Sequence, residues 1–99
     1  MIRREHTSNP NTVLIAFEYP AATRARQVHL VGDFNEWDEL ATPMGKDKRT
    51  GIWTVQLELA RGREYQFRYL VDQSIWHNDW HADRFVPNIH GSDNSVVSA

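Results

Sequence analysis

The chain has 99 residues, and its 11 Lys and Arg against 13 Asp and Glu give a formal charge of −2. A chain of this length buries one hydrophobic core and is too short for a barrel-type catalytic scaffold. It contains no cysteine, which excludes disulfides, thiolate metal sites and cysteine nucleophiles. Its slight acidity disfavours a nucleic-acid partner, because such proteins usually carry a basic excess.

The N-terminal segment, residues 1–11, is polar and ends in the turn sequence Asn9-Pro10-Asn11. We therefore expect a flexible arm followed by one domain over residues 12–99. No apolar run reaches the length of a signal-peptide core or a membrane span. These features predict a cytoplasmic protein with no membrane partner.

Alternation of apolar and polar residues predicts β-strands through most of the chain. It is clearest at 53–59, where one face is apolar and the other polar. The segment 65–71 carries aromatic residues on one face and Arg68 on the other. The other predicted strands are 12–19, 27–31, 75–77 and a final edge strand at 94–98, with tight turns at 60–63 and 72–74. Such short strands with closely spaced turn signals and no convincing helix are typical of an all-β antiparallel sandwich.

Four tryptophans are many for a chain of this size. Trp53 falls on the apolar face of its strand, so we expect it in the core. Trp37, Trp76 and Trp80 fall in or beside turns, where an indole either packs under the loop or offers a binding face. We expect Trp80 to pack beneath its loop, which leaves Trp37 and Trp76 without a place in the core.

Arg68 lies on the outer face of its strand, and the turn at 72–74 brings Trp76 back toward it. A guanidinium beside an indole suits a sugar, because the C–H face of a glucose ring stacks on aromatic surface. The sugar hydroxyls need donors and acceptors at the ring edge. Ser92 and Asn94 are available for those edge contacts.

The sequence also resembles a known family. The resemblance lies in the run 28–37, which contains Gly32-Asp33-Phe34-Asn35-Glu36-Trp37, in the strand 65–72, and in Trp76. These are similar to carbohydrate-binding module family 48, also called the isoamylase N-terminal or early-set domain. This family includes the glycogen-binding domain of the AMP-activated protein kinase β subunit.

The resemblance implies an immunoglobulin-like early-set sandwich that binds α-1,4-glucan polysaccharide or maltooligosaccharide and needs no cofactor. It implies that the chain is not an enzyme, that it looks like a stand-alone bacterial member, and that a glycogen-metabolising enzyme is its partner. It implies stacking on Trp37 and Trp76 and a basic contact from Arg68. The further contacts that it implies are His90, Ser92 and Asn94.

Three other site hypotheses follow from the residues. His77 and His81, with Asp79 and Asp83 nearby, have metal-ligand spacing, but no third ligand at a fixed position is evident. The alternative is a polar loop in which the two aspartates cap backbone amides. The acidic residues around Trp37 would suit a hydrolase only if two carboxyl groups faced each other across a cleft, and we expect a solvated rim instead.

RNA stacking on the 65–69 segment would require its aromatic rings and Arg68 to share one face, whereas alternation separates them. The alternative of a different class is an interaction domain without sugar affinity, in which Trp37 and Trp76 anchor a protein interface.

Overall fold

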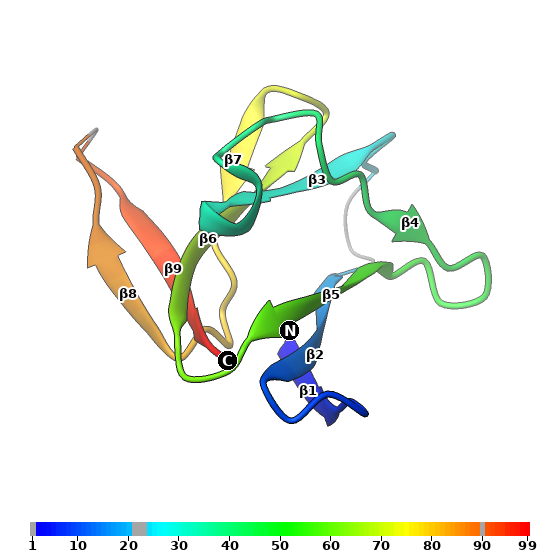
Figure 1. Ribbon diagram of the computed structural model, residues 1–99. Helices are drawn as coiled ribbons and strands as arrows, with labels where there is room; N and C mark the ends of the chain where they lie inside the picture. The colour runs from blue at the N-terminus through cyan, green and yellow to red at the C-terminus, as the bar shows by residue number, and fades with distance from the viewer. Residues whose placement is uncertain (1, 21–23, 90) are drawn as a thin grey trace.

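The computed structural model describes residues 2–20, 24–89 and 91–99. Two antiparallel sheets pack against each other, which confirms the predicted all-β, immunoglobulin-like sandwich (Figure 1). One sheet has the strand order β1-β2-β5-β4, and the other has the order β3-β6-β9-β8 with β7 also paired to β6. Within the described ranges, no helix is long and apolar enough to cross a membrane. The elements are β1 (Ile2–His6), β2 (Thr12–Tyr19), β3 (Val28–Gly32), the 3-10 helix η1 (Asp33–Asn35), β4 (Gly45–Lys46), β5 (Trp53–Ala60), β6 (Glu64–Val71), β7 (Ile75–His77), β8 (Arg84–Pro87) and β9 (Asp93–Ser98).

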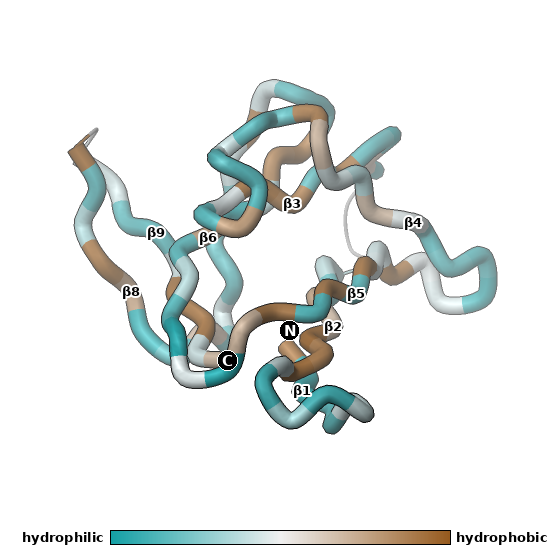
Figure 2. Tube along the Cα trace, viewed as in Figure 1, coloured by the Kyte–Doolittle hydropathy of each residue, from teal (hydrophilic) through white to brown (hydrophobic). Residues whose placement is uncertain are grey.

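The core lies between the inward faces of the two sheets. Phe17 of β2 and Phe67 of β6 are fully buried, with ring centroids 5.1 Å apart in an edge-to-face arrangement that aromatic pairs favour. Trp53 is buried as predicted. Figure 2 shows hydrophobic residues recurring along β2 and β5 and hydrophilic residues gathered in the turns. The alternation along 12–19 and 65–71 is therefore confirmed as the pattern that builds the core.

The N-terminal residues differ from the expected flexible arm, because residues 2–6 form β1 and pair with β2 from Ile2 opposite Phe17 to His6 opposite Val13. A free edge of β2 would present unpaired N–H and C=O groups, and β1 satisfies them by backbone bonding alone. Its polar side chains carry no alternating pattern, so this strand was not predicted.

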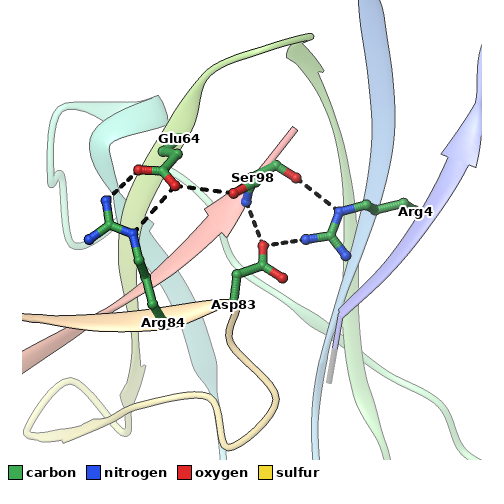
Figure 3. A network of polar contacts seen from close by, with 5 residues as sticks. All are labelled: Arg4, Glu64, Asp83, Arg84 and Ser98. Atoms are coloured by element: carbon green, nitrogen blue, oxygen red, sulfur yellow. Dashed lines mark hydrogen bonds and ion pairs between the residues drawn. The ribbon is translucent and has the colours of Figure 1, made fainter.

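A polar network ties β1 to the other sheet (Figure 3). The Arg4 guanidinium donates to the Ser98 carbonyl at 2.9 Å and to the Asp83 carboxylate, which also accepts the Ser98 N–H at 2.7 Å. Arg84 forms an ion pair with Glu64, and hydrogen bonding from Arg84 lowers the pKa of the Glu64 carboxyl. The contacts of Arg4 hold the first and last strands side by side.

The predicted last strand forms as β9, but it is not an edge strand, since β9 lies between β6 and β8. The sequence did not predict β8, which covers that edge. Its four residues include a proline and are mostly exposed, so they carry no apolar alternation.

A buried polar contact anchors the loop between β7 and β8. The Tyr69 hydroxyl donates to the Asp79 carboxylate at 2.6 Å, and both residues are buried. The Asp79 N–H donates to Ser95 Oγ at 2.9 Å, and the Asp79 carboxylate accepts the His81 N–H at 2.8 Å. Burial, followed by the charge of Asp79, raises the pKa of the Tyr69 hydroxyl well above its ordinary value.

Replacing Gly32 should destabilise the fold, because a Cβ at this position would lie 2.5 Å from the Gln66 carbonyl oxygen and 2.8 Å from the Phe67 Cβ. We expect Gly32→Ala to lower the free energy of unfolding by about 1–3 kcal/mol, as overpacking does. Urea denaturation followed by tryptophan fluorescence measures this. Gly45→Ala is the matched control, since its Cβ would meet nothing nearer than 4.0 Å, and equal stability of the two variants would contradict the prediction.

Alkaline pH should destabilise the protein through Tyr69. Its raised pKa in the folded state means that the unfolded chain releases the phenolic proton first, so the stabilisation is complete below about pH 10 and is lost as the pH rises beyond it. We expect the free energy of unfolding to fall above pH 10 with a shallower slope in Tyr69→Phe. Urea denaturation from pH 8 to 11 tests this. Tyr19→Phe is the comparison variant, because burial alone raises the pKa of the Tyr19 hydroxyl, whereas Asp79 also raises that of Tyr69. An unchanged slope in Tyr69→Phe would refute the assignment.

Candidate functional site

One edge of β6 changes partner at Arg68. Residues 64–67 of this edge pair with β9, whereas residues 69–71 pair with β7. Because β9 and β7 cannot both continue along the same edge, they separate there. A groove of about 900 Å³ opens on the outer face of the sheet beside this fork. Its described lining comprises Trp37, Glu39, Gln66, Arg68, Trp76, Pro87, Asn88, Ile89 and Asn94.

Trp37 reaches the groove from the loop after β3. Glu36 and Trp37 both have a φ of 59°, the left-handed conformation that non-glycine residues rarely adopt. The Trp37 N–H donates to the Gly32 carbonyl, and its indole N–H donates to Asp33 Oδ1, both at 2.9 Å. Two consecutive strained residues held by hydrogen bonds indicate that the position of this indole is enforced by the fold.

Asp33 is exposed, as expected for the acidic residues around Trp37, and it also has a structural task. Its second carboxylate oxygen accepts the Gln66 N–H of β6 at 2.7 Å, so one side chain joins the Trp37 loop to the strand that carries Arg68. The Gly-Asp-Phe-Asn-x-Trp element predicted Trp37 as a site residue, but no spacing rule indicated that the preceding aspartate would hold it.

Trp76 lies on β7, opposite Leu70 of β6 in the strand register. The Arg68 guanidinium lies over its ring, with Cζ 5.6 Å from the ring centroid, which is within range of a cation–π interaction. Trp76 remains 36% exposed. The Nε–H of Arg68 is buried and has no hydrogen-bond acceptor within the described part of the chain. Arg68 thus contacts the indole of Trp76 through its guanidinium, and its Nε–H is left as a donor without an acceptor among the described residues.

Amide side chains form a chain of hydrogen bonds along the groove floor. Asn94 donates to Gln66 Oε1 at 3.0 Å and accepts from Asn88 Nδ2 at 3.2 Å. Asn94 is buried, and Gln66 lies on the same outward face of β6 as Arg68. Sequence reasoning missed Gln66, although its place two residues before Arg68 put it on the same strand face.

The structure brings four of the six predicted site residues together, since Trp37, Arg68, Trp76 and Asn94 all line the groove. Ser92 is not among its lining residues, and its backbone instead bonds to Asn88 in the turn between β8 and β9. The predicted contact His90 lies outside the residues that the structure describes.

The loop after β7 differs from expectation at Trp80, which is 88% exposed and does not pack beneath its loop. Asp79 occupies the interior instead, and Asp79 and Asp83 accept backbone N–H groups as the polar-loop alternative predicted. His77 Nδ1 lies 3.2 Å from the Tyr19 hydroxyl. In the described ranges, no three His, Cys, Asp or Glu side chains converge as a metal site would require.

The chain matches a known protein family and is similar in sequence to part of several enzymes. The family model for carbohydrate-binding module 48, the isoamylase N-terminal domain, matches residues 16–86. The 1,4-alpha-glucan branching enzyme GlgB of Frankia casuarinae is 37% identical over 79 residues, which cover 79% of this chain. The corresponding enzyme of Aquifex aeolicus is 45% identical over 60 residues, covering 54% of the chain. In each case the match spans about 10% of the enzyme's own length.

The solved structure of the enterobactin esterase FES from Shigella flexneri superposes with a TM-score of 0.75 over 98% of this chain and 32% of the esterase. The two are 10% identical in sequence, so the likeness concerns the fold alone.

Proposed function

The chain belongs to the carbohydrate-binding module 48 family, and we propose that it binds α-1,4-linked glucan chains without catalysing a reaction on them. The observation that carries the proposal is the convergence of Trp37, Arg68, Trp76 and Asn94 on one groove. The likeness to glucan branching enzymes supports glucan as the polysaccharide.

The chemistry of the groove suits a sugar polymer. The indoles of Trp37 and Trp76 offer flat apolar surface for the C–H faces of glucose rings. The Nε–H of Arg68 lacks an acceptor, which a glucose hydroxyl can supply, and the amides of Gln66 and Asn94 provide donors and acceptors at the ring edge. Stacking thus supplies affinity while the polar groups select the ring orientation.

A binding role fits the groove better than a hydrolytic one. Among its described lining residues, Glu39 is the single carboxylate, whereas glycoside hydrolysis generally uses two carboxyl groups placed across the scissile bond.

The affinity for glucan should be modest. Two indole platforms at about 1–2 kcal/mol each, with a few hydrogen bonds, give a dissociation constant of roughly micromolar to millimolar. Such a module would hold a glycogen-metabolising partner near its substrate.

Truncating either indole should weaken glucan binding. We expect Trp37→Ala and Trp76→Ala each to lower the affinity for amylopectin by about tenfold, because each loses one stacking surface. Affinity electrophoresis in native gels containing amylopectin or glycogen measures the effect as a loss of retardation.

Leu40→Ala is the matched control, because Leu40 is 63% exposed and does not line the groove. The Leu40→Ala variant should be retarded in the gel as much as the unmodified chain. Absence of retardation in the unmodified chain, or retardation in both tryptophan variants that equals that of the unmodified chain, would refute glucan binding at this groove. Co-purification of a protein that both substitutions release would then favour the interaction-domain alternative.

A further inference from the structure

A second groove, of about 400 Å³, adjoins the candidate site and shares two of its walls, Arg68 and Trp76. The rest of its described lining combines aromatic rings with polar side chains, as in the first groove: His77, Asn78, Asp79, Trp80, Phe85 and Asp93. This part of the surface therefore has the chemical character of the candidate site and continues directly from it.

Trp80 is the unusual member of this second groove, since 88% of its surface is exposed. An exposed apolar patch rimmed by polar side chains is typical of a contact site. Phe85 of β8, which is 47% exposed, provides a second ring in the same lining.

Hydrogen bonds of the two preceding residues, Asn78 and Asp79, anchor the loop that carries Trp80. Its neighbour Asp79 is buried and bonded to the Tyr69 hydroxyl and to Ser95. Asn78 donates to the Asp93 carbonyl at 3.0 Å and accepts the Ser95 hydroxyl at 2.9 Å. A ring on an anchored loop costs little backbone freedom when a ligand stacks on it, which favours binding.

We propose that the second groove is an additional subsite for the same glucan chain, with Trp80 stacking on a glucose unit beyond those held at Trp37 and Trp76. The proposal rests on the proposed function, because it requires that a glucan occupy the first groove. Since Arg68 and Trp76 line both grooves, a chain bound across Trp76 can extend directly into the second groove. Affinity should then increase with chain length until the second groove is filled.

Isothermal titration calorimetry with maltotriose and maltoheptaose tests this in the full chain. We expect maltoheptaose to bind more tightly than maltotriose. Trp80→Ala should lower the maltoheptaose affinity by about fivefold to tenfold and leave maltotriose unaffected, because the short sugar does not reach Trp80. Trp80→Phe, which keeps a smaller ring, should restore part of the loss, while Leu40→Ala should bind both sugars normally.

The outcomes separate the two hypotheses. Equal maltoheptaose affinity in Trp80→Ala and the unmodified chain, with binding lost in Trp76→Ala, would overturn the second subsite and leave glucan binding intact. A loss of maltotriose and maltoheptaose affinity in equal proportion in Trp80→Ala would also overturn it, because the effect would not depend on chain length. Failure of the unmodified chain to bind either sugar would overturn the proposed function and this inference together.

Discussion

Backbone pairing along one edge of β6 passes from β9 to β7 at Arg68, and the rest of the outer surface is arranged around that change of partner. Two strands that share an edge must diverge, since each N–H and C=O of β6 can serve only one of them. The divergence leaves the outward side chain of Arg68 between the strands and brings β7 to one side of it with Trp76. β9 departs on the other side with Asn94, so the groove is a direct result of strand pairing.

The opposite wall depends on how closely the loop after β3 can approach β6. Gly32 allows this approach, because a Cβ there would meet the Gln66 carbonyl and the Phe67 side chain. Asp33 then bonds to both Gln66 and Trp37, and the left-handed turn at Glu36 and Trp37 directs the indole over the sheet. Backbone strain in this turn is offset by the hydrogen bonds around it, which is a common arrangement at binding sites.

Features that impose a periodic pattern on the sequence were predicted, and features that leave no such pattern were missed. Alternation identified the core strands and Trp53, because a sheet with one buried face imposes a period of two on its sequence. β1 and β8 were missed because the backbone bonds that pair an edge strand leave no mark in side-chain polarity. Trp80 was misplaced because a loop has no periodicity to say which neighbour turns inward. Asp79 does so, and its partner Tyr69 lies on another strand. The site residues Trp37 and Trp76 were predicted only by excluding them from the core and by family resemblance.

The contacts of Arg4 with Ser98 and Asp83 also fix where anything joined to this domain would project. β9 runs from Asn94 in the groove to Ser98 beside β1, a separation of about 13 Å at the usual rise of an extended strand. Both ends of the described chain lie close together in Figure 1, near the end of β9 that is farther from Asn94. A surface, a tag or a second domain joined at either end would therefore be attached at a point outside the groove lining, so immobilisation through an end does not require contact with Trp37 or Trp76.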